Sequence, residues 1–198
     1  MRLWLGAVFF LSGGVALVYQ LVWQRALFAM YGLEVVSVTL VVTSFLLGLG
    51  LGSLAGGVLS RAYSDVQLPL FAFLEFGIGL FGFFSLDLFA RVAQWTTGIG
   101  YTATGLVAFL LVVIPTTCMG ATLPLLVAYM TRLSGNVGRS VSTLYFLNTV
   151  GAAGGAYLAA TVLLSEFGLT GTAQTAAGLN VGLAVVVVAM TALERRLA

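Results

Sequence analysis

The chain has 198 residues, of which 61% are hydrophobic and 7% are charged, and its formal net charge is +2. Soluble domains carry about 25% charged residues, so eight basic and six acidic residues could not cover a soluble globule of this length. With no His and one Cys, the sequence excludes His-based zinc sites, His general bases and internal disulfides. We therefore predict an integral membrane protein with no metal or other cofactor, and the small net charge gives no reason to expect nucleic acid as a partner.

Six apolar runs are long enough to cross a bilayer, since a spanning helix needs about 20 apolar residues. They cover roughly residues 3–28, 35–59, 68–88, 98–130, 141–164 and 169–193. The runs are continuously apolar and do not alternate, which argues against a β-barrel. The first run lacks a small-residue cleavage site, so we do not expect a cleaved signal peptide.

One face of the first run carries four residues at spacings of 4, 3 and 4: Ser12, Ala16, Tyr19 and Trp23. Gln20 lies beside this face, which we expect to look into the bundle. Tyr19, Gln20 and Trp23 are therefore candidates for binding a substrate, although aromatic rings near a span end also serve as interface anchors. Arg25 is a further candidate, and its alternative role is to reach the outer headgroups.

The second run has glycine at every fourth position, at Gly48, Gly52 and Gly56. Residues at this spacing share one helix face, and small residues there let the backbones of two membrane helices approach closely. We predict that these three glycines mark a helix contact.

The third run contains the most deeply placed charged residue, Glu75, about three residues from the centre of its span. An ionised carboxylate at that depth needs a cation, a donor or a watery cavity. Glu75 is therefore a candidate counter-ion for a cationic substrate, or a proton relay. The alternative is a structural carboxyl group that is hydrogen-bonded to a neighbouring helix.

The fourth run is too long for one straight span and contains Pro115 and Pro124. Proline removes a backbone donor and clashes with the preceding turn, so we predict a kinked or partly interfacial helix. A short extra interfacial helix at 94–101 is the alternative.

The fifth run places Tyr145 and Asn148 beside Gly151 and Gly155. We expect the two polar side chains to line a cavity and the two glycines to allow close helix packing. Asn148 could instead serve only to hydrogen-bond another helix.

The two halves of the chain resemble each other at an offset of 103 residues. This offset aligns residues 37–39 with 140–142, and Gly48 and Gly52 with Gly151 and Gly155. Because three spans separate the units, the second unit must be inverted, as in each six-helix half of major facilitator transporters. We predict one domain, 1–198, with repeat units of about 1–92 and 93–198. The alternative is that helices rich in small residues look alike by composition.

The arginines predict the orientation of the six spans. One side of the membrane would hold Arg2, Arg61, Arg132, Arg139, Arg195 and Arg196. The other side would hold Arg25 and Arg91. By the positive-inside rule, we expect both termini in the cytoplasm. The expected location of the protein is the inner membrane of the cell.

Three motifs resemble the membrane domain of fused major-facilitator/spermidine-synthase-like proteins. They are Ser12-Gly13-x-x-Ala16-Leu17-x-Tyr19-Gln20-x-x-Trp23-x-Arg25, Pro115-Thr116-x-x-Met119-Gly120-Ala121-Thr122-Leu123-Pro124 and Leu144-Tyr145-x-x-Asn148-Thr149-x-Gly151-Ala152-x-x-Gly155. Leu74-Glu75 also matches a recurring pair in the third helix of that family. The resemblance implies a six-helix, major-facilitator-like half bundle and a connection to polyamine-like metabolites.

Members of that family usually continue into a soluble aminopropyltransferase-like domain, and this sequence departs from them there. The glycine-rich stretch 48–52 lies within an apolar run and cannot be a phosphate loop. We therefore expect no enzyme activity. The first hypothesis is a half-size transporter for polyamine-like or other small cationic metabolites, acting as an oligomer. The alternative is a non-catalytic accessory subunit that anchors a separately encoded enzyme or a larger membrane complex.

Overall fold

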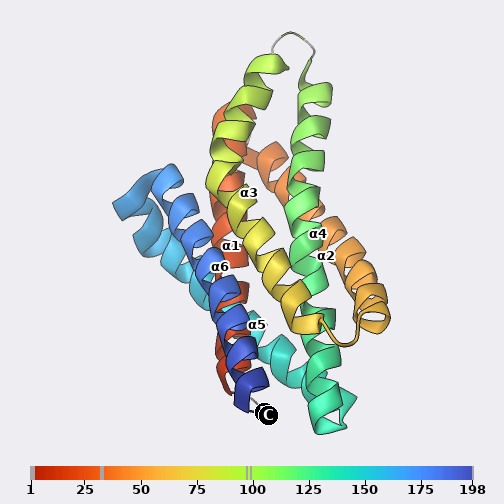
Figure 1. Ribbon diagram of the computed structural model, residues 1–198. Coiled ribbons are helices and arrows are strands. Elements are labelled where there is room, and N and C mark those ends of the chain that lie inside the picture. The colour runs from red at the N-terminus through yellow and green to blue at the C-terminus, as the bar shows by residue number, and fades with distance from the viewer. Residues whose placement is uncertain (1–2, 32–33, 97, 99, 198) are drawn as a thin grey trace.

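Helices account for almost all of the computed structural model, which describes residues 3–31, 34–96, 98 and 100–197 (Figure 1). Their bounds are α1 (Leu3–Tyr31), α2 (Glu34–Ala62), α3 (Gln67–Trp95), α4 (Tyr101–Ser134), α5 (Val137–Leu158), a π-helical turn η1 (Ala159–Leu163) and α6 (Leu164–Leu197). No strand occurs in these described ranges. The predicted all-α fold of the membrane type is confirmed.

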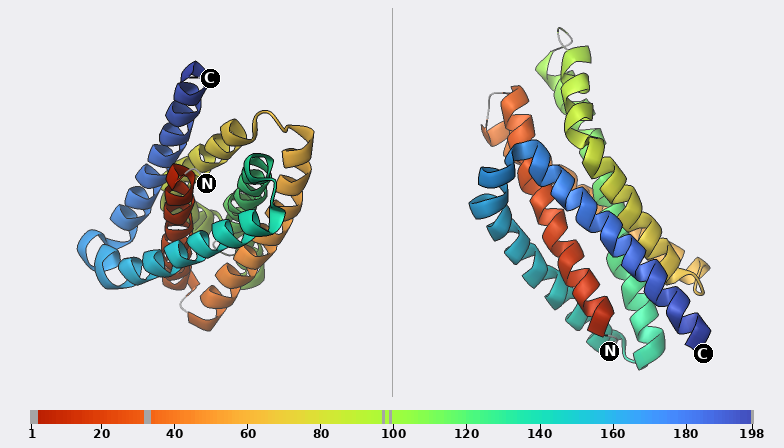
Figure 2. Two further views of the ribbon diagram at one scale, coloured as in Figure 1. Left: turned by 90° about the horizontal axis from the view of Figure 1, so that it is seen from below. Right: turned by 60° about the vertical axis from the view of Figure 1, so that its left-hand side comes forward.

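Among the described residues, five helical runs are long and apolar enough to cross a membrane. Four of them correspond to α1, α2, α3 and α4, and the fifth is the 60-residue stretch Val137–Arg196. Within this stretch Gly168 has φ +63° and ψ −171°, a conformation that glycine tolerates and that is not helical. The chain turns back at this point, so that α5 and the rest of α6 run in opposite directions (Figure 2). The Thr172 hydroxyl closes the turn by donating to the Leu163 carbonyl at 2.9 Å.

The helices pack most extensively in three pairs, α2 with α4, α1 with α5 and α3 with α6. Glycine makes the first two contacts possible. A Cβ atom on Gly52 would lie 2.0 Å from the Thr117 carbonyl oxygen, and one on Gly151 would lie 1.8 Å from that of Phe10. The other three glycines of the sequence pattern meet the same partner helices: Gly48 and Gly56 on α4, and Gly155 on α1.

Short polar segments connect the helices. Gly135, with φ +67°, ends α4, and the Asn136 side chain then caps α5 by accepting from the Arg139 backbone N–H at 2.9 Å. Residues 96, 98 and 100, between α3 and α4, lie outside any helix, so the described residues do not form the alternative extra helix at 94–101. Helix α4 continues through Pro115 and Pro124, and a bend at these prolines stays a prediction.

The first and last helices meet at one end of the bundle. Figure 2 shows α1 beginning and α6 ending on the same side. The Trp4 indole N–H of α1 donates to Glu194 Oε1 of α6 at 3.4 Å, which ties these ends together.

Candidate functional site

Glu75 is fully buried in the centre of the bundle and is held from two neighbouring helices. The Ser12 hydroxyl of α1 donates to Oε1 at 2.6 Å, and the Asn180 amide of α6 donates to Oε2 at 2.5 Å. A carboxylate removed from water is costly unless its oxygens find donors. Both of its oxygens have one here.

A glycine one turn further along α3 brings Asn180 within reach. A Cβ atom on Gly79 would lie 3.0 Å from the Ala177 carbonyl oxygen and 3.1 Å from Asn180 Cβ. Helices α3 and α6 can therefore approach closely where the amide meets the carboxylate. Asn180 is 2% exposed, and its Oδ1 atom has no hydrogen-bond partner among the described residues. This place thus offers an unused acceptor beside the carboxylate.

A cavity of about 370 Å³ opens next to Glu75 and is lined by residues from each of α1 to α6. Its polar lining residues are Ser12, Ser53, Thr122, Tyr145, Asn148 and Asn180. The rest of the described lining is apolar or glycine, and none of the described lining residues is charged. Since Ser12 and Asn180 belong to the wall and also hold Glu75, the carboxylate lies directly behind that wall.

Two of the residues that the sequence indicated on α5 reach this cavity. Tyr145 and Asn148 both line it. The Asn148 side-chain amide also donates to the Phe9 carbonyl of α1 at 3.2 Å. Gly13 of α1 allows this close approach, since a Cβ atom on it would lie 2.3 Å from the Asn148 backbone carbonyl oxygen. Asn148 therefore combines the two roles that the sequence left open, a place in the cavity wall and a hydrogen bond to another helix.

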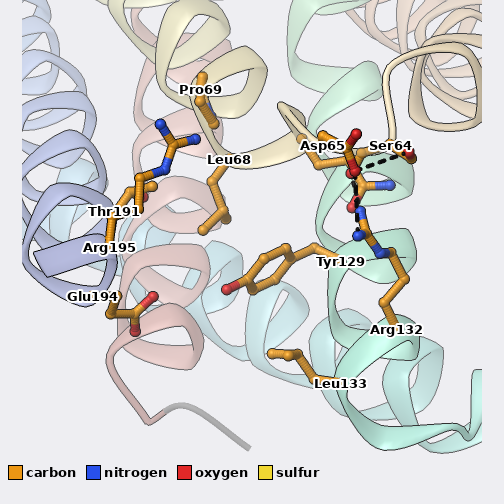
Figure 3. A pocket seen from close by; sticks show the side chains of 11 residues that line it. Ser64, Asp65, Leu68, Pro69, Tyr129, Arg132, Leu133, Thr191, Glu194 and Arg195 are labelled. Carbon is orange, nitrogen blue, oxygen red and sulfur yellow. Dashed lines mark hydrogen bonds and ion pairs between the residues drawn. The ribbon is translucent and has the colours of Figure 1, made fainter. Parts of the chain in front are cut away.

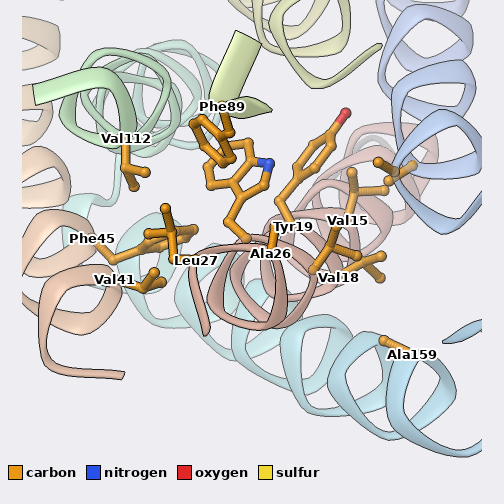
Figure 4. Close-up of a cluster of buried hydrophobic side chains, with 14 of the residues drawn as sticks. Val15, Val18, Tyr19, Ala26, Leu27, Val41, Phe45, Phe89, Val112 and Ala159 are labelled. Carbon is orange, nitrogen blue, oxygen red and sulfur yellow. The ribbon is translucent and has the colours of Figure 1, made fainter. Parts of the chain in front are cut away.

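Four other candidates, all on α1, lie outside the cavity lining. Tyr19 and Trp23 are fully buried and stack on each other with ring centroids 5.1 Å apart. They belong to the apolar cluster of Figure 4, where the Trp23 indole N–H donates to Ser85 Oγ at 3.0 Å. Gln20 is half-buried, and Arg25 is exposed. The structure therefore places Tyr145 and Asn148 in the lining of the cavity beside Glu75, whereas these four lie outside that lining.

Sequence reasoning missed Asn180, Ser53 and Thr122 as parts of the site. Asn180 is an amide in the middle of an apolar run, so the argument applied to Glu75 would have singled it out. Ser53 and Thr122 gave no such signal, because small hydroxyl residues are common at membrane helix contacts.

Within the described part of the chain, no three His, Cys, Asp or Glu side chains gather where they could hold a metal ion. No protein-family model, no curated protein and no solved structure matches the chain. The site is therefore interpreted from its own geometry.

Proposed function

We propose that this chain is a half-size membrane transporter for small cationic metabolites, polyamine-like amines among them, which acts as an oligomer. The observation that carries the proposal is the cavity of about 370 Å³, whose wall includes both hydrogen-bond partners of the buried Glu75 carboxylate. Binding sites for small molecules are typically concave, mostly apolar and equipped with a few converging polar groups. This cavity has that character.

The proposed architecture is a major-facilitator-like half bundle of six spans built from a 3+3 inverted repeat. Exchanging α1 with α4, α2 with α5 and α3 with α6 converts the α2–α4 contact into α5–α1 and returns α3–α6 to itself. The glycines at the α2–α4 and α1–α5 contacts follow the same exchange. The packing pattern supports the repeat, and the resemblance of residues 12–25, 115–124 and 144–155 to the fused spermidine-synthase-like family points the same way.

The proposed substrate follows from the hydrogen-bonding capacity of the site. The Glu75 carboxylate and the free Asn180 Oδ1 are acceptors, and a protonated amine supplies several N–H donors together with a compensating charge. In twelve-helix transporters two halves rock around a central site. A second copy of this chain would supply the missing half. The proposed location of the protein is the inner membrane, with both termini in the cytoplasm.

Uptake of labelled putrescine and spermidine into vesicles that contain the purified protein tests the proposal. We expect uptake above that of protein-free vesicles and its loss in Glu75→Gln, which keeps the side-chain shape but removes the charge. Asp87→Asn on the same helix is the matched control, because Asp87 is exposed, and it should leave uptake unchanged. Uptake equal to that of empty vesicles, or undiminished in Glu75→Gln, contradicts the proposal.

The second candidate function is an accessory subunit that anchors an enzyme or a larger complex. It is favoured by the uncharged cavity lining and by the two donors on Glu75, which are also what a structural carboxyl group needs. The native mass of the complex purified in mild detergent separates the two. Fixed partner subunits in stoichiometric amounts, without amine flux, would favour the accessory role.

A further inference from the structure

A second cavity, of about 320 Å³, lies at the end of the bundle where α1 begins and α6 ends (Figure 3). We name it the end pocket. It lies between the α2–α3 connection, the start of α3 and the last turns of α4 and α6. Its charged and amide lining residues are Asp65, Gln67, Arg132, Glu194 and Arg195.

The two arginines of the end pocket differ in how they are engaged. Arg132 pairs with Asp65 at 3.4 Å and also donates to the Ser64 carbonyl oxygen. Arg195, by contrast, makes neither an ion pair nor a side-chain hydrogen bond with any described residue. Its side chain extends from α6 toward Pro69 at the start of α3 (Figure 3). Arg195 therefore brings to the start of α3 a positive charge that forms no ion pair with a described carboxylate.

The start of α3 adds donors to this charge. Val66, the residue before the helix, makes no side-chain cap, and Pro69 has no backbone N–H. The backbone N–H groups of Gln67 and Leu68 thus remain at the positive end of the helix dipole, an arrangement that favours an anion such as phosphate.

Gln67 supplies an acceptor at the same place. Its side chain is 3% exposed, and its Nε2 atom donates to the Ser60 carbonyl at 2.9 Å. Its Oε1 atom has no partner among the described residues. A buried amide oxygen without a partner is costly, so a ligand that carries an N–H or O–H donor would be stabilised beside it.

From these contacts we infer that the end pocket binds a phospholipid headgroup. The phosphodiester lies between Arg195 and the start of α3, and the group beyond the phosphate donates a hydrogen bond to Gln67 Oε1. Ethanolamine and glycerol headgroups carry such a donor, whereas the trimethylated nitrogen of choline has none. The position at the end of a membrane-spanning bundle favours a lipid over a free phosphodiester.

Native mass spectrometry of the detergent-solubilised protein tests this inference without any transport assay. The titrants are phosphatidylethanolamine, phosphatidylglycerol and phosphatidylcholine with identical acyl chains. We expect the first two to bind about tenfold more tightly than the third, the effect of one hydrogen bond of ~1.4 kcal/mol. Arg195→Gln should weaken all three by about tenfold. Arg196→Gln, at an exposed neighbour outside the pocket lining, is the matched control and should change nothing.

Gln67→Leu tests the donor in the headgroup, because it removes the acceptor while keeping the size of the side chain. We expect this variant to bind the three lipids equally. The melting temperature of this variant in detergent, measured alongside, shows whether its fold is intact. If the variant does not fold, the ranking of the three lipids by the wild-type chain tests the inference. Equal affinity of the wild-type chain for the three lipids, or a preference for phosphatidylglycerol alone, overturns the inference. So does displacement of the lipid by an equal concentration of soluble glycerophosphoethanolamine, which would identify a free phosphodiester as the ligand.

Discussion

The hydrogen bond between Asn180 and Glu75 allows a sharp test of the buried carboxylate. The variants are Asn180→Leu, Glu75→Leu and the double variant, which together form a double-mutant cycle. Hydrogen bonds between neutral side chains of membrane helices average ~0.6 kcal/mol. Hydrogen bonds to a charged group contribute about 1.5–3 kcal/mol. Because both Glu75 oxygens accept from donors, as those of an ionised carboxylate do, we expect a coupling energy in the higher range.

The single variants should each be strongly destabilising, because Asn180→Leu leaves a buried carboxylate oxygen without its donor and Glu75→Leu leaves two donors without an acceptor. In the double variant only the Ser12 hydroxyl loses its partner, so the loss should be much smaller than the sum of the two. The measurement is reversible unfolding in mixed detergent micelles, followed by helical circular dichroism. Gln174→Leu, at an exposed position on the same helix, is the control and should stay within about 0.5 kcal/mol of the wild type. If the two single losses add within about 0.5 kcal/mol, the hydrogen bond does not stabilise the bundle and the reasoning is wrong.

Three further predictions rest on the packing and on the arrangement of the helix ends. Gly151→Ala should destabilise the protein by at least about 1–3 kcal/mol through overpacking against Phe10. Gly154→Ala, with open space around the residue, should be neutral or should stabilise the protein by up to about 1 kcal/mol in the same unfolding assay. Equal effects of the two changes would refute the close α1–α5 contact. Trp23→Phe should lower the melting temperature, because it removes the indole hydrogen bond to Ser85. Ser85→Ala, added to Trp23→Phe, should then lower the melting temperature only slightly further. If Ser85→Ala lowers it as much in Trp23→Phe as in the wild type, the hydrogen bond between the two side chains does not stabilise the fold. In a Cys118→Ser background, Ser134→Cys should react with a membrane-impermeant thiol reagent only from the cytoplasmic side and Trp95→Cys only from the outside. These two exposed residues are the last residues of α4 and α3, and Figure 1 shows these two helices ending at opposite ends of the bundle. Labelling of both from one side would contradict the proposed orientation.

The sequence determined the class of structure because the bilayer leaves few choices. Long apolar runs with so few charges must form helices that satisfy their own backbone hydrogen bonds. The glycine spacing on α2 and α5 likewise indicated contacts that the structure contains, since glycines four residues apart share one helix face. Glu75 was recognisable as a candidate site residue for the same kind of reason, as an ionisable group in the middle of an apolar run.

Only the tertiary structure decided which polar side chains meet. Ser12 and Asn180 lie 63 and 105 positions from Glu75 in the chain, and no local pattern reports how three helices are rotated and shifted against one another. Helix α1 illustrates the limit: Ser12, Tyr19 and Trp23 share one face, yet Ser12 lies at the cavity, whereas Tyr19 and Trp23, further along the helix, lie in the apolar core. Local spacing fixes which residues share a helix face, but the direction in which that face points depends on helix contacts between residues that are distant in the chain.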